Sequence, residues 1–122
     1  MLKDNLYTIR TKNVLSESEI ELDIQLDQEH EIFKGHFPQQ AVLPGVCLID
    51  MLTEILSEHL NKPLQLTDAS AVKYLRMVTP DKDSNLKLKL TFDQQESGVA
   101  LQASSLLEDA STNMKFKGVY KY

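Results

Sequence analysis

Alternation of apolar and polar residues is the clearest pattern in this chain. From residue 20 to residue 26 every second residue is apolar, and the intervening positions carry Glu21, Asp23 and Gln25. The run LKLKLTF, residues 86–92, alternates in the same way. A period of two places alternate side chains on opposite faces of a strand, so both runs predict strands with one buried face.

The remaining segments predict one helix among further strands. Strand-like runs and polar turns cover most of the rest of the chain, with runs at residues 6–15, 63–80, 98–109 and 113–122 and turns at residues 16–18, 80–83 and 95–98. Residues 46–62 predict a helix, because Pro44 suits a first helical turn and Asn61 and Pro63 mark the far end. Hairpin connections imply an antiparallel sheet, whose apolar face the helix must cover. We therefore expect one α+β domain over residues 1–122.

The predicted helix carries apolar residues around almost its whole circumference. These residues are Val46, Cys47, Leu48, Ile49, Met51, Leu52, Ile55 and Leu56. A helix that is apolar all round is buried all round, so we expect a strongly curved sheet or a second subunit to wrap it. Asp50 interrupts this run, and Glu54 follows one turn later. Asp50 is then either a buried functional carboxyl group or a solvent-facing residue in line with Glu54 and Glu58.

Composition narrows the classes of function. A chain of 122 residues is long enough for one domain with a core, and a net charge of −5 without a basic stripe argues against a nucleic acid partner. Cys47, the single cysteine, is expected to be a buried residue and not a nucleophile, and His30 and His59 are interpreted as ordinary surface residues. Because no Cys/His cluster has zinc spacing, no metal is expected. The chain shows no signal peptide and no apolar segment of membrane-spanning length, which predicts a cytoplasmic protein without a membrane partner.

The segment GHFPQQAVLPGVCLID, residues 35–50, combines chemistry-bearing residues at particular spacings. Gly45 follows His36 by nine residues, and Asp50 follows it by fourteen. A lone loop histidine is by itself most often a hydrogen-bonded structural residue. The whole segment, however, resembles the signature of the β-hydroxyacyl-acyl carrier protein dehydratases, a hot-dog-fold family. That signature is Gly-His-Phe-Pro, a short spacer, then Pro-Gly-Val opening a central helix that carries an acidic residue. The resemblance covers roughly residues 22–90.

This resemblance implies a hot-dog fold, in which a curved antiparallel β-sheet wraps around one long central helix. It also implies a hydro-lyase that eliminates water from a 3-hydroxyacyl thioester to give the trans-2-enoyl thioester, in fatty-acid or polyene-type biosynthesis. By resemblance, His36 would remove the C2 proton and Asp50 would protonate the leaving hydroxyl group. The Gly45 N–H, near a helix N-terminus, would bind the thioester oxygen.

The resemblance implies further site residues and partners. Phe37 would anchor the histidine loop, and Val46 and Glu54 would lie beside the substrate. The family forms homodimers in which the histidine of one subunit faces the acid of the other, so a homodimer or a higher oligomer is expected. The substrate would be carried on the phosphopantetheine of an acyl carrier protein, without a metal or redox cofactor. The candidate contacts for that acidic carrier are Lys73, Arg76 and Lys82, unless these are ordinary solvated charges.

Two departures from the family pattern keep alternative functions open. Glu54 stands where family members commonly have glutamine, and an aspartate at position 50 is the choice of the branch that also isomerises the double bond. One alternative is a hot-dog acyl thioesterase, which would hydrolyse the thioester with a carboxylate-activated water and would not need His36. The other is a non-catalytic acyl-binding subunit that has kept the fold.

Overall fold

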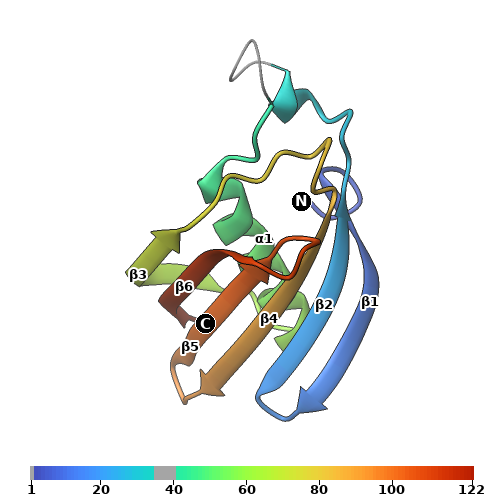
Figure 1. The fold of residues 1–122 in the computed structure, drawn as a ribbon. Coiled ribbons are helices and arrows are strands. Elements are labelled where there is room, and N and C mark those ends of the chain that lie inside the picture. The colour runs from blue at the N-terminus through green and yellow to red at the C-terminus, as the bar shows by residue number, and fades with distance from the viewer. Residues whose placement is uncertain (1, 35–40) are drawn as a thin grey trace.

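One helix lies against the concave side of a six-stranded antiparallel sheet in the computed structural model, which describes residues 2–34 and 41–122 (Figure 1). The elements in chain order are β1 (Tyr7–Ser16), β2 (Glu19–Leu26), the 3₁₀ turn η1 (Glu31–Phe33), α1 (Gly45–Leu60), β3 (Gln65–Tyr74), β4 (Asn85–Gln94), β5 (Gly98–Leu106) and β6 (Thr112–Lys121). The order across the sheet is β1-β2-β4-β5-β6-β3. This arrangement confirms the predicted architecture of a curved antiparallel sheet around one long helix.

The register of the strands puts their apolar residues on one face, as the alternation predicts. Ile20 lies opposite Leu90, and Leu22 lies opposite Leu88, on neighbouring strands β2 and β4. All four side chains are buried. The chain crosses from α1 to the far edge of the sheet, where β3 pairs with β6. The edges of the sheet are therefore β1 and β3, and the core lies between the sheet and α1.

The helix ends follow local sequence signals, with one shift at the start. Pro44 has an extended backbone (φ −61°, ψ 139°) and is the N-cap, so the helix begins at Gly45 and not at the proline. Asn61 adopts the left-handed conformation at the C-cap (φ 55°, ψ 44°). Asparagine tolerates this conformation better than most residues, which explains why the helix stops there.

The sheet of the single chain does not wrap α1 on all sides, so the other expected cover, a second subunit, stays a prediction. The buried residues of α1 are Cys47, Leu48, Met51, Leu52, Ile55 and Leu56. By contrast, Val46 is 62% exposed and Asp50 is also exposed. One sheet covers only one side of a helix, so the side of α1 that carries Val46 and Asp50 stays open in the single chain. Within residues 2–34 and 41–122, no helix is long and apolar enough to cross a membrane.

The expectation for His30 needs correction. His30 is not an ordinary surface residue, because its Nδ1 accepts a hydrogen bond from the Ile32 N–H at 3.0 Å and caps η1. Its Nε2 also contacts the Asn5 side chain.

The predicted catalytic His36 and the anchoring Phe37 lie outside the described residues.

Candidate active site

The first turns of α1 hold two of the predicted site residues, Gly45 and Asp50. The Gly45 N–H is one of the first four of the helix, which have no partner within it, and the positive end of the helix dipole lies there. Asp50 lies just over one turn further along. Both residues therefore belong to the same end of the same helix.

The ring of Tyr74, the last residue of β3, packs directly on Gly45. A Cβ atom at position 45 would lie 2.3 Å from Tyr74 Cζ and 2.5 Å from its hydroxyl oxygen. Tyr74 is nevertheless 52% exposed, and partial burial raises the pKa of its hydroxyl. The two residues line a pocket of about 300 Å³, together with Leu43, Leu48 and the segment Leu75–Val78. The missing side chain at position 45 thus makes room for Tyr74, a contact that the sequence does not reveal.

Asp50 is solvent-exposed in the single chain, next to a small polar cluster on the helix and β6. Burial, and secondly the charge of Asp50, raise the pKa of the Cys47 thiol. Burial raises the pKa of Tyr120, whose hydroxyl group lies 2.9 Å from Thr53 Oγ1. The dry apolar surroundings that were expected for Asp50 are not supplied by this chain alone, because the sheet lies on the other side of α1.

Glu54 does not point towards Gly45 but holds the N-terminal segment onto the helix. Its carboxylate accepts hydrogen bonds from the Leu2 N–H at 2.9 and 3.1 Å and from the Lys3 N–H at 3.1 Å. The Tyr7 hydroxyl lies at 3.5 Å from the same carboxylate. Burial, and secondly the charge of Glu54, strongly raise the pKa of Tyr7. The sequence gives no signal for this role, because Leu2 and Glu54 are 52 residues apart.

An exposed apolar surface borders the site, and we call it the apolar rim. Its residues are Val46, Val72, Tyr74, Leu75 and Met77, which come from the first turn of α1, the end of β3 and the loop after β3. Met77 is 65% exposed and Leu75 is 48% exposed. A cluster of large apolar side chains left open to water is typical of a surface that another chain covers.

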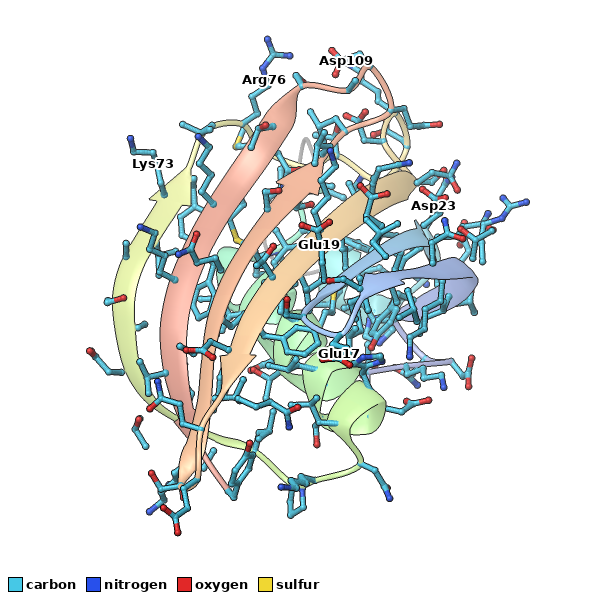
Figure 2. All side chains as sticks on the ribbon, turned by 90° about the horizontal axis from the view of Figure 1, so that it is seen from below. Glu17, Glu19, Asp23, Lys73, Arg76 and Asp109 are labelled. Carbon is cyan, nitrogen blue, oxygen red and sulfur yellow. The ribbon has the colours of Figure 1, made fainter. Side chains whose placement is uncertain are left out.

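The three predicted carrier-binding residues lie on β3 and on the connection that follows it to β4. Lys73 lies on β3, Arg76 lies in the loop after β3 and not on the strand as expected, and Lys82 lies in the turn closed by its N–H to the Thr79 carbonyl. Arg76 forms an ion pair with Asp109 at 3.5 Å, and Figure 2 shows the two side chains together at one end of the molecule. The charge of Arg76 is therefore already paired with the Asp109 carboxylate. Lys73 has other neighbours, because its side chain lies on the outer face of the sheet.

Curated relatives of this chain are 3-hydroxyacyl-(acyl-carrier-protein) dehydratases named FabZ. The protein of Macrococcus caseolyticus is 28% identical over 74 residues, which are 55% of this chain and 51% of the relative. That of Syntrophobacter fumaroxidans is 30% identical over 66 residues, 48% of this chain and 45% of the relative. The chain thus spans about half the length of these two relatives. The protein of Lactococcus lactis subsp. cremoris is 27% identical over 83% of this chain and 74% of its own length.

Solved structures with the same fold include a dehydratase. The Dehydratase Heterocomplex ApeI:P from Xenorhabdus doucetiae matches with a TM-score of 0.77 at 22% identity, covering 94% of this chain and 97% of that one. A hypothetical thioesterase from Streptococcus pneumoniae matches with a TM-score of 0.68 at 11% identity, covering 94% and 84%. These likenesses confirm the predicted hot-dog fold. The sequence pattern of the ApeI-like family, described as ApeI dehydratase, matches residues 11–117. The chain therefore belongs to the ApeI-like dehydratase family.

Proposed function

We propose that this protein removes water from a 3-hydroxyacyl thioester, carried on an acyl carrier protein, to give the trans-2-enoyl thioester. The observation that carries the proposal is the family match over residues 11–117, which includes the whole segment from Gly35 to Asp50. The place of Gly45 and Asp50 on the first turns of α1 supports it. A fatty-acid or a polyene-type pathway fits this chemistry.

The elimination needs a base at C2 and an acid at the C3 hydroxyl group. In the proposed site, the imidazole of His36 takes the C2 proton, and the electrons of that C–H bond form the C2–C3 double bond. The C3–O bond breaks, and Asp50 gives a proton to the departing oxygen, which leaves as water. The Gly45 N–H and the N-terminal end of α1 stabilise the negative charge that develops on the thioester oxygen.

The proposed site needs a second subunit, because one chain leaves Asp50 and the apolar rim open. A partner that packs on the apolar rim would remove water from the helix face that carries Asp50 and would bring in its own histidine loop. Apolar cover of this kind strengthens the electrostatic interactions within a site. The partner in the proposal is a second copy of the chain. The ApeI:P complex of Xenorhabdus doucetiae is a heterocomplex, so a different hot-dog chain is the other arrangement to test.

One assay separates dehydration from the two alternative functions. The purified protein is incubated with a short 3-hydroxyacyl thioester of pantetheine, and both the enoyl product and free thiol are followed. We expect the enoyl thioester without release of thiol. Release of thiol would support a thioesterase, and neither product, with the fold and oligomer intact, would support a non-catalytic acyl-binding subunit.

Variants of the proposed acid and base test the site itself. His36→Ala and Asp50→Asn should each lower turnover by about two to four orders of magnitude, the usual contribution of a positioned acid or base. The double variant should be little slower than either single one, because the two groups act as a unit. Near-full activity of His36→Ala would contradict the proposed chemistry.

Mixing the two inactive variants tests the composite site. A mixed dimer holds one intact pair of His36 and Asp50 if each site draws on both subunits, so part of the activity should return. Subunit exchange must be verified with an independent label. No recovery despite proven exchange would place both residues of a site in one chain.

A further inference from the structure

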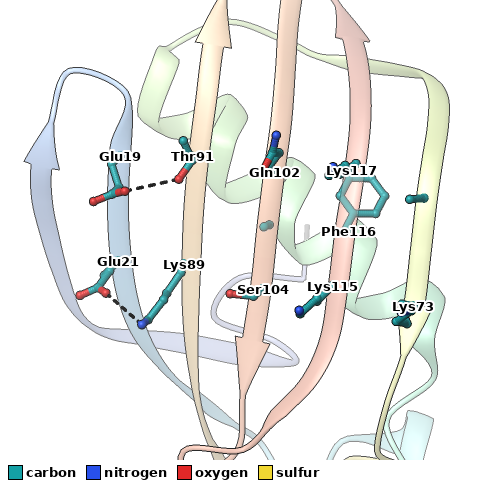
Figure 3. Close-up of a pocket in the computed structure, with 12 residues that line it drawn as sticks. Glu19, Glu21, Lys73, Lys89, Thr91, Gln102, Ser104, Lys115, Phe116 and Lys117 are labelled. Carbon is teal, nitrogen blue, oxygen red and sulfur yellow. Dashed lines mark hydrogen bonds and ion pairs between the residues drawn. The ribbon is translucent and has the colours of Figure 1, made fainter.

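The outer face of the sheet carries a row of charged residues whose order follows from the strand register. Glu21 lies opposite Lys89, Lys89 opposite Ser104, Ser104 opposite Lys115, and Lys115 opposite Lys73. This row crosses five strands from β2 to β3, as Figure 3 shows. It has one carboxylate, Glu21, next to Lys89 at the β2 end, then the neutral Ser104, and two lysines at the β3 end.

The second row lies two residues further along the strands, and it also runs from a glutamate on β2 to a lysine on β6. Glu19 lies opposite Thr91, Thr91 opposite Gln102, and Gln102 opposite Lys117. The two rows surround a shallow depression of about 560 Å³ on the outer face. Three lysines of β3 and β6 thus line one side of this depression, and we call Lys73, Lys115 and Lys117 the lysine cluster.

The charges on the β2 and β4 side of the face are already paired. Lys89 lies 3.7 Å from the Glu21 carboxylate, and Lys87 lies 3.7 Å from that of Asp23. The three members of the lysine cluster are exposed, and none has a carboxylate within 4.0 Å in the part of the chain that the structure describes. The face is therefore neutralised on one side and positively charged on the other.

Distance keeps the carboxylates of β2 from compensating the lysine cluster. Strands are about 4.8 Å apart, so Glu21 lies roughly 14 Å from Lys115 along its row. That separation exceeds the Debye length of about 8 Å at physiological ionic strength. Lys73 and Lys115 also face each other directly, and like charges directly opposite are destabilising. The cluster therefore does not stabilise the fold, but an anionic partner would relieve its repulsion.

We propose that the lysine cluster is the docking surface for an acidic protein, and that this protein is the thioester carrier. Naming the carrier rests on the proposed function. Three separate ammonium groups on one face of a sheet match several carboxylates spread over a protein surface. Val119, two residues after Lys117 on β6, is 43% exposed and adds an apolar contact beside them. Lys73 also directly precedes Tyr74, which packs on Gly45, so a partner docked there lies at the end of β3 that borders the site.

The test compares two matched double variants in the full-length protein. Lys115→Glu/Lys117→Glu and Lys87→Glu/Lys89→Glu alter the same residue types, at the same spacing, on the same face, with the same change in charge. The affinity for a fluorescently labelled acyl carrier protein bearing its pantetheine arm is measured by anisotropy at low and at physiological salt. We expect the β6 variant to bind about tenfold more weakly at low salt, and the β4 variant to stay close to the unaltered protein.

Turnover of a carrier-free pantetheine thioester separates this proposal from the proposed function. Both variants should keep that turnover, which also shows that they fold. Equal loss of carrier affinity in the two variants, or no binding of the carrier to the unaltered protein, would overturn the docking surface. Selective loss of binding in the β6 variant would uphold it, even if the carrier-free substrate proved not to be dehydrated.

Discussion

The ring of Tyr74 fills the space beside Gly45 that any side chain at position 45 would need. The last residue of an edge strand thereby contacts the first residue of the central helix. This contact brings together the end of β3, the start of α1 and the pocket between them. It also gives the glycine a packing role besides the proposed role of its N–H.

Gly45→Ala should destabilise the protein in the presence of Tyr74 but not in its absence. The new Cβ atom would lie 2.3 Å from Tyr74 Cζ, so the half-exposed ring must move away from its present rotamer, at a cost of about 0.5–1.5 kcal/mol. In a Tyr74→Ala background the same change should be neutral or stabilising, because alanine favours a helix more than glycine does. Urea unfolding of the four proteins measures this coupling, and simple additivity would contradict it.

Glu54→Gln should loosen the N-terminal segment. The carboxylate accepts hydrogen bonds with both oxygens, whereas an amide can accept with only one, and we expect a loss of about 0.5–1.5 kcal/mol of unfolding free energy. Urea unfolding and hydrogen exchange at the Leu2 and Lys3 amides measure the effect. Glu58→Gln is the matched control, because Glu58 makes an exposed ion pair with Lys3, and such pairs contribute little. Equal losses in the two variants would contradict the bridging role of Glu54.

The Cys47 thiol should react slowly with a disulfide reagent in the folded protein at neutral pH. Burial, and secondly the charge of Asp50, raise its pKa and so reduce the fraction of reactive thiolate. Asp50→Asn should increase the rate only slightly, because burial is the larger cause. A rate in the folded protein equal to that in urea would show that the thiol is accessible.

His59 should make stability fall as the solution becomes acidic. Burial, and secondly the charge of Lys12, lower its pKa from the usual 6.5, so the unfolded chain takes up a proton at a higher pH than the folded chain does. The stability that comes from keeping His59 uncharged in the folded protein is fully present above pH 6.5. It is lost as the pH falls through 6.5 towards the lower pKa of the folded state. When the pH falls from about 7.5 to about 5.5, the unaltered protein should therefore lose more unfolding free energy than His59→Gln does. A difference between the two proteins that is independent of pH would contradict this assignment.

Local sequence patterns predicted most of the secondary structure, because each depends on backbone geometry over a few residues. Alternation placed Ile20 and Leu88 on the buried face of their strands, and Asn61 marked the end of α1. The motif from Gly35 to Asp50 indicated the dehydratase family, and the family match includes it. The roles of His36 and Asp50 stay predictions, and His36 lies outside the described residues.

The tertiary structure decided which distant residues meet. The sequence could not place Tyr74 on Gly45, Glu54 beneath Leu2, or Lys73 opposite Lys115, because these pairs depend on the path of the chain. After α1 the chain crosses to the far edge of the sheet, where β3 pairs with β6 and not with β2. The sequence by itself determined the strands, the helix and the family, since the spacing of side chains along the backbone sets them. Only the packing of α1 on one side of the sheet decided that Asp50 stays open to water in the single chain, and only the register of β5, β6 and β3 decided that three lysines share one face.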